Sequence, residues 1–76
     1  MIIVHPFIKA VGDAIKRAKE EDVLMYVRET PNAYHVTSTY EKDWLFKAYP
    51  GGRKILSKSG NKLYQRIKSE TPNEVI

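Results

Sequence analysis

The chain has 76 residues, with thirteen Lys/Arg, nine Asp/Glu, a formal net charge of +4 and no cysteine. This length suits one domain, and the missing cysteine excludes disulfides, thiolate zinc sites and cysteine nucleophiles. No apolar run approaches the ~20 residues that cross a bilayer, and the opening segment lacks the charged start of a secretory signal, so we expect a cytoplasmic protein.

A helix is predicted from Pro6 to about residues 20–22. His5 precedes a proline, which favours extended backbone there, and Pro6 suits a first helical position. The apolar residues that recur at helical spacing and form one face are Phe7, Ile8, Val11, Ala14, Ile15 and Ala18. The β-branched run Ile2–Val4 ahead of this helix either adds an edge strand or pairs with another chain.

An antiparallel hairpin is predicted next. Residues 23–29 are rich in β-formers, and Thr30-Pro31-Asn32 has turn chemistry. Residues 33–40 then alternate, with Tyr34 and Val36 pointing to one side and His35 to the other.

A third strand is predicted over Trp44–Tyr49, with Trp44, Phe46 and Ala48 on one side. Pro50-Gly51-Gly52 is a strong turn signal, and a short fourth strand is predicted from Arg53 to Leu56.

The last segment leaves two alternatives open. Residues 62–68 fit either a short helix capped by Asn61 or a final strand, and residues 71–76 are expected to form a flexible tail. The predicted fold is therefore α+β. It is a single domain over residues 1–70, in which an N-terminal helix packs on a three- to four-stranded antiparallel sheet, with a possible short C-terminal helix.

The positive charge is concentrated in the second half. Residues 1–41 carry five Lys/Arg and six Asp/Glu, whereas residues 42–76 carry eight and three. Between Trp44 and Ser69 there are seven cations, no acid and several aromatic rings. Clustered cations attract phosphates through counterion release, and interleaved rings suit unpaired bases.

This pattern favours a small non-catalytic module that contacts a nucleic-acid backbone. The predicted phosphate contacts are Arg53, Lys54, Lys58, Lys62, Arg66 and Lys68, and the predicted stacking rings are Trp44 and Tyr49. Four to six such contacts predict a log–log salt slope of roughly −4 to −5.

Other interpretations of the same residues stay open. In one, the cations belong to a solvated surface, and in another they meet an acidic protein. In a third, the chain is a protein-interaction module or a small regulator or inhibitor, including a homodimer. Catalysis is not predicted: the carboxylates give no acid–base pair, and His35 alone is a weak candidate. His5 and His35 have no metal-ligand spacing, so no metal, cofactor or small-molecule substrate is expected.

The order helix–strand–strand–strand–helix resembles that of double-stranded-RNA-binding domains. Their binding signature places lysines at the start of the last helix, and Lys58, Lys62, Arg66 and Lys68 fall in that region. The signature itself is absent here. The resemblance is therefore one of topology, which implies no function by itself.

Overall fold

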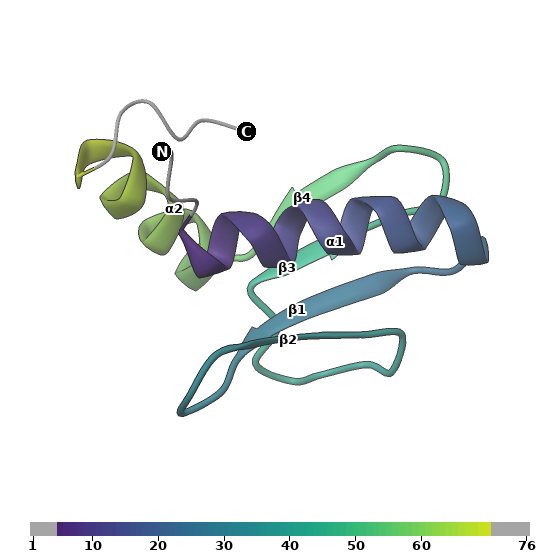
Figure 1. Ribbon diagram of the computed structural model, residues 1–76, viewed down its shortest axis with the longest axis horizontal. Helices are drawn as coiled ribbons and strands as arrows, with labels where there is room; N and C mark the ends of the chain where they lie inside the picture. The colour runs from purple at the N-terminus through teal and green to yellow at the C-terminus, as the bar shows by residue number, and fades with distance from the viewer. Residues whose placement is uncertain (1–4, 71–76) are drawn as a thin grey trace.

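A helix crosses one face of an antiparallel sheet, and a second helix stands at one end of that sheet (Figure 1). The computed structural model describes residues 5–70. In chain order, its elements are α1 (Pro6–Glu21), β1 (Met25–Glu29), β2 (Tyr34–Thr37), β3 (Phe46–Ala48), β4 (Lys54–Leu56) and α2 (Lys58–Glu70). This arrangement confirms the predicted α+β fold. The predictions for Ile2–Val4 and residues 71–76 lie outside the described residues.

Helix α1 begins and ends where the sequence predicts. The His5 Nδ1 accepts a hydrogen bond of 3.1 Å from the Phe7 N–H, which caps the first turn, and Pro6 follows at the first helical position. At the other end Asp22 adopts a left-handed φ of 55°, and the Val23 N–H donates to the Ala18 carbonyl. The buried face of α1 consists of Phe7, Ala10, Val11, Ala14 and Ala18.

The strand order across the sheet is β2-β1-β3-β4, and every pairing is antiparallel. Because strand side chains alternate, Met25 and Val27 of β1 share the face that α1 covers, and both are fully buried. Phe46 and Ala48 of β3 lie beside them in register and are also buried. We call this the inner face of the sheet and the opposite one the outer face.

The connection from β2 to β3 passes over the outer face of β1. Both strands pair with β1, so residues 38–45 must cross it. Tyr26 and Arg28 alternate with the buried residues of β1 and point outward. The Tyr40 ring meets the Tyr26 ring at 90°, and Glu41 Oε2 lies 3.6 Å from Arg28 Nε. Residues 38–40 therefore belong to the crossing and not to the predicted strand, and β2 ends at Thr37.

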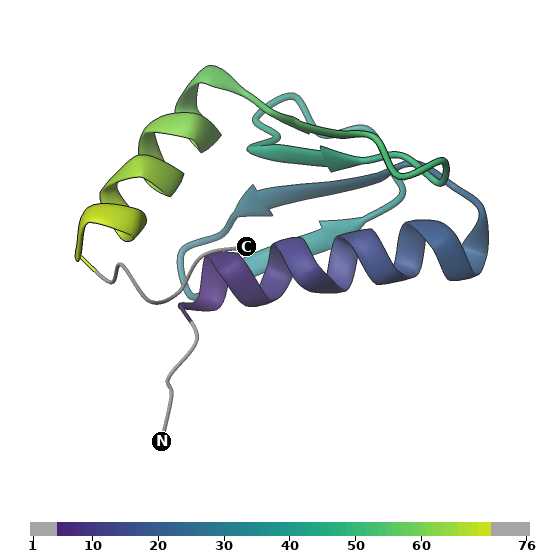
Figure 2. The ribbon, with the colours of Figure 1, turned by 90° about the horizontal axis from the view of Figure 1, so that it is seen from above.

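Helix α2 is longer than predicted and is capped by a different residue. Ser57 Oγ accepts from the Gly60 N–H at 3.0 Å, and the Ser57 N–H donates to the Leu45 carbonyl, also at 3.0 Å. The cap is therefore Ser57, not Asn61, and the segment is a helix rather than a strand. Helix α2 stands beside one end of the two layers (Figure 2), and its buried residues are Gly60 and Ile67.

Trp44 does not follow the predicted alternation. It precedes β3 instead of beginning it, and its ring contacts Lys47, whose side chain points to the outer face. The prediction that Trp44 shares a side with Phe46 and Ala48 is therefore wrong. Neither α1 nor α2 is long and apolar enough to span a membrane.

Candidate nucleic-acid interface

The fold separates the predicted phosphate contacts. Arg53 precedes β4 and lies at the end of that strand farthest from α2, in the turn between β3 and β4 (Figure 2). Its guanidinium carbon lies 5.6 Å from the centre of the Tyr49 ring, and the Tyr49 N–H donates to the Arg53 carbonyl at 2.8 Å. Arg53 and Tyr49 therefore form a local pair at a distance from the predicted contacts on α2.

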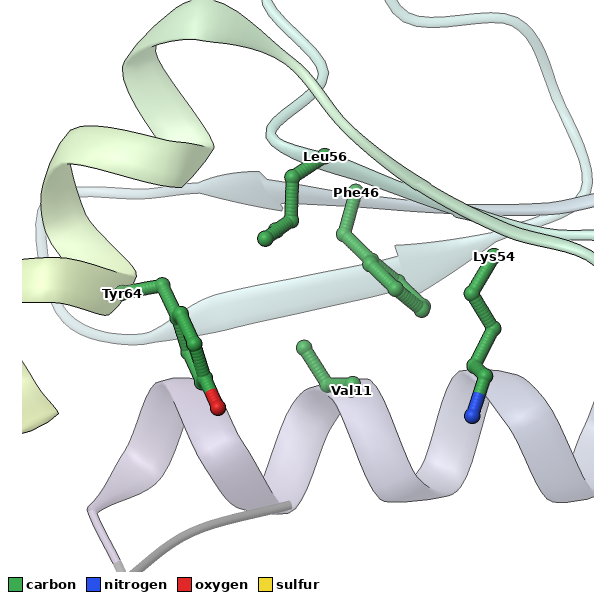
Figure 3. A pocket seen from close by; sticks show the side chains of 5 residues that line it. All are labelled: Val11, Phe46, Lys54, Leu56 and Tyr64. Carbon is green, nitrogen blue, oxygen red and sulfur yellow. The ribbon is translucent and has the colours of Figure 1, made fainter.

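Lys54 lies on the α1 side of the sheet. It pairs in register with Ala48, which places its side chain on the inner face at the exposed edge formed by β4. It lines a hollow of about 250 Å³ with Val11, Phe46, Leu56 and Tyr64. The Lys54 amine and the Tyr64 hydroxyl both point toward α1 (Figure 3). The ammonium group of Lys54 thus faces away from the outer face.

Three of the cations on α2 form a continuous stripe. Lys58, Lys62 and Arg66 recur every four residues, so at about 100° per residue they fall within about 80° of the helix circumference. Neighbours at this spacing lie about 6 Å apart. All three are exposed, whereas Gly60 and Ile67 on the far side of the helix are buried. We call these three residues the basic stripe.

Lys68 belongs to another side of α2. Helical geometry puts it about 120° from the middle of the basic stripe, on the flank next to Tyr64. Tyr64 in turn lies on the side of α2 opposite the stripe and lines the hollow that contains Lys54. Lys68 therefore lies away from the basic stripe, and Lys54 of β4 lies on the opposite side of α2 from it.

The basic stripe borders a groove made of two adjoining hollows. Their volumes are about 500 and 380 Å³, and they share Glu29, Leu45 and Ser59 as lining residues. The charged residues that line the groove are Lys42, Lys58, Lys62, Arg66, Glu29 and Asp43. Four cations thus face two carboxylates, so the groove has a positive balance.

Trp44 connects this groove to the outer face of the sheet. The half-buried ring lines the larger hollow, and the Lys47 Nζ lies 4.3 Å from its centre. The same Nζ lies 6.0 Å from the centre of the Tyr26 ring, which in turn contacts Tyr40. We call Tyr26, Tyr40 and Trp44 the aromatic cluster. Within this cluster Tyr40 is exposed, Trp44 is half-buried and Tyr26 is buried beneath them. Trp44 connects the cluster to the basic stripe, because it lines the larger hollow together with Lys58.

Sequence reasoning selected Trp44 but missed the groups around it. Lys42, Lys47 and Tyr40 were not predicted contacts, because their proximity depends on the crossing of residues 38–45 over β1. Nothing in the local pattern indicates that crossing, since β-formers continue through Tyr40.

The far end of the basic stripe interacts electrostatically with the sheet. Burial raises the pKa of Tyr34 above its ordinary value, and the negative charge of Glu29 raises it further, whereas the positive charge of Arg66 lowers it. Tyr34 and Glu29 are register partners on β2 and β1. Arg66 thus sits close enough to this pair for its charge to be felt there.

Neither histidine lines the groove. His5 caps α1, and His35 is exposed on the outer side of β2, opposite Arg28. Among residues 5–70, no three His, Asp or Glu side chains gather to form a metal site. No protein-family model, curated protein or solved structure matches the chain. The functional argument therefore depends on the geometry of the groove, the basic stripe and the aromatic cluster.

Proposed function

We propose that the chain is a non-catalytic nucleic-acid-binding domain that holds backbone phosphates with the basic stripe. The observation that carries this proposal is the alignment of Lys58, Lys62 and Arg66 on one exposed face of α2, at the border of a groove. Clustered cations bind polynucleotides because each neutralised phosphate releases condensed counterions.

Two further lysines extend the proposed contact beyond α2. Lys42 lines the same hollow as Lys58, and Lys47 lies over the Trp44 ring. The proposed interface therefore has five cations. It leaves out Arg53, Lys54 and Lys68, which the fold places elsewhere, and Tyr49, which lies beside Arg53.

Five phosphate contacts give a defined salt dependence. At about 0.7 counterions released per contact for a single strand, the log–log slope is about −3.5, and at about 0.9 for a duplex it is about −4.5. A surface that merely solvates the protein gives no saturable binding at low salt.

The test compares two triple variants with the same change in net charge. One is Lys58→Gln, Lys62→Gln, Arg66→Gln, and the control is Lys9→Gln, Lys16→Gln, Lys19→Gln on the exposed side of α1. Lys, Arg and Gln have similar helix propensities, so folding is preserved in both. Binding of labelled single-stranded and duplex oligonucleotides is measured by fluorescence anisotropy between 50 and 200 mM salt.

We expect the stripe variant to lose affinity and to flatten the salt slope by about 2 to 3, because three contacts are removed. The control should keep most of the affinity of the unmodified protein. Equal losses in the two variants, or no binding of either kind of oligonucleotide at 50 mM salt, would reject the proposal.

A protein-interaction module or regulator is the second candidate. The observation that favours it is the exposed Tyr40 ring beside the half-buried Trp44 ring, because Tyr and Trp side chains commonly anchor protein interfaces. This alternative predicts saturable binding to a protein or to a second copy of the chain, with little response to added nucleic acid. Sedimentation of the unmodified chain over a range of concentrations, with and without oligonucleotide, distinguishes the two.

A further inference from the structure

We infer that the nucleic acid bound at this site is single-stranded, with its backbone along the basic stripe and its bases against Tyr40 and Trp44 of the aromatic cluster. This inference rests on the proposed function and deepens it. The proposed base contacts lie on the outer face of the sheet, whereas the phosphate contacts of the basic stripe lie on α2.

The first argument is the exposure of an aromatic ring on the same face of the sheet as Lys47. Tyr40 is 64% exposed, which is unusual for a large side chain that also packs on a neighbouring ring. In a duplex the bases are already stacked on each other, so a ring beside the phosphates gains nothing from them. Unpaired bases offer free π-faces, and stacking on aromatic side chains is a principal source of affinity for single strands.

The second argument is the position of Lys47. Its ammonium lies 4.3 Å from the centre of the Trp44 ring and 6.0 Å from that of Tyr26. Tyr26 is buried, so the ring beside this cation that a base can reach is that of Trp44. The Lys47 ammonium can meet a phosphate while a neighbouring base contacts the Trp44 ring. This alternation of ring and cation matches the alternation of base and phosphate along a single strand.

The third argument is that the aromatic cluster is fixed before any ligand binds. The Leu45 N–H donates to the Val27 carbonyl at 2.6 Å, and the Trp44 N–H donates to the Glu41 carbonyl at 3.2 Å. Glu41 is in turn held near Arg28, and the Thr39 N–H donates to Thr37 Oγ1 at 3.1 Å. A platform that is already ordered loses little conformational entropy when it binds.

The site is short. The basic stripe covers about 12 Å along α2, and the aromatic cluster adds the width of two neighbouring strands. We therefore expect the site to hold roughly four to six nucleotides, within the range of other single-strand platforms.

The experiment uses the full chain and three probes of equal length, roughly 12 nucleotides each, which exceeds the expected site. They are oligo(dT), the corresponding duplex, and an abasic strand that has the phosphates without the bases. Tyr40→Ala removes the exposed ring, and Tyr40→Phe keeps it without the hydroxyl. Trp44, the single tryptophan of the chain, reports binding through its own fluorescence.

We expect the unmodified protein to bind oligo(dT) roughly 5- to 100-fold more tightly than the abasic strand, and to quench Trp44 when it does so. Tyr40→Ala should lose most of this preference for oligo(dT), while its affinity for the duplex changes little. Tyr40→Phe should retain the preference. Because Tyr40 is largely exposed, circular dichroism should show both variants folded.

Equal affinity for the three probes, or an oligo(dT) affinity unchanged in Tyr40→Ala, would overturn the inference. The proposed function would then still stand if the stripe variant lost binding to all three. Binding of none of the probes would overturn both.

Discussion

Gly60 packs directly against the backbone of Leu45, so that a Cβ built on Gly60 would overlap the Leu45 carbonyl oxygen. The same carbonyl accepts the Ser57 N–H, and Ser57 caps the helix to which Gly60 belongs. Leu45 also donates its own N–H to Val27 in β1. This contact therefore fixes where α2 starts relative to the sheet, and with it the position of Lys58 beside Trp44.

The first prediction is that Gly60→Ala destabilises the protein by about 2 kcal/mol. Alanine gains about 1 kcal/mol of helix propensity over glycine, but overlap with a backbone carbonyl forces α2 away from the sheet and typically costs more than that gain. Urea unfolding followed by far-UV circular dichroism measures the change. A stabilised Gly60→Ala would mean that α2 is not seated on Leu45.

The second prediction is that Gly12→Ala has the opposite sign. Gly12 is exposed in the middle of α1, and no atom lies within 4 Å of a Cβ built there. Alanine should therefore stabilise the protein by about 0.4 to 1 kcal/mol, which raises the Tm by several degrees in a domain of this size. Thermal unfolding measures this change in Tm. The Gly12→Ala variant also serves as the matched control for Gly60→Ala. A lower Tm would contradict it.

The fold was predictable where local chemistry and packing agree. Pro6 and the apolar spacing of α1 predicted its start, its end and most of its buried face, which also includes Ala10 and leaves Ile8 and Ile15 half-buried. The turns at Pro31 and Gly51-Gly52 separated the strands. The crossing of residues 38–45 was not predictable, because alternation assigns faces within a strand but does not say which strands become neighbours. The length of α2 was also missed, since Ser57 and Gly60 together resemble a loop until their contacts with Leu45 are known.

The candidate site was predicted only in part, for the same reason. Three of the six predicted phosphate contacts share one face because they lie on one helix at four-residue spacing. Arg53 and Lys54 are adjacent in sequence, but Arg53 lies in the turn before β4 beside Tyr49, whereas the register of β4 directs Lys54 to the inner face. On a helix, residues that are close in sequence share a surface only when they are three or four positions apart. Residues that are close in sequence but divided between a turn and a strand rarely share one.

The third prediction is that the paired variant Glu29→Gln, Asp43→Asn binds nucleic acid more tightly. These carboxylates line the groove and offset two of its four cations. Their removal should raise the affinity roughly 3- to 10-fold at low salt, with a smaller effect as added salt screens the charges. Anisotropy titrations at 50 and 200 mM salt test this.

The control for this prediction is Glu20→Gln, Asp22→Asn, which changes the net charge equally at the far end of α1. An equal gain in this control would mean that overall charge, and not the groove, governs binding. Weaker binding by the groove variant would mean that the carboxylates themselves receive hydrogen bonds from the ligand.

The fourth prediction concerns stability at alkaline pH. Burial, and secondarily the charge of Glu29, raise the pKa of Tyr34 above its ordinary value of 10.0, while Arg66 opposes this effect. The unfolded chain then loses the Tyr34 proton at a lower pH than the folded chain does. The contribution of Tyr34 to the free energy of unfolding is fully present below about pH 10. It is lost as the pH rises through the pKa of Tyr34 in the folded chain.

Tyr34→Phe has no proton to lose at this position, so its stability should fall less than that of the unmodified protein between about pH 9 and about pH 11. Urea unfolding of both proteins over this range isolates the contribution of Tyr34, because titrations elsewhere cancel in the difference. Glu29→Gln should lower the pKa of Tyr34 and Arg66→Gln should raise it, as read from ultraviolet absorbance in difference titrations against the Tyr34→Phe forms. An unchanged pKa in Arg66→Gln would mean that the basic stripe ends farther from the sheet than the structure places it, because a charge that is felt at Tyr34 cannot be removed without effect.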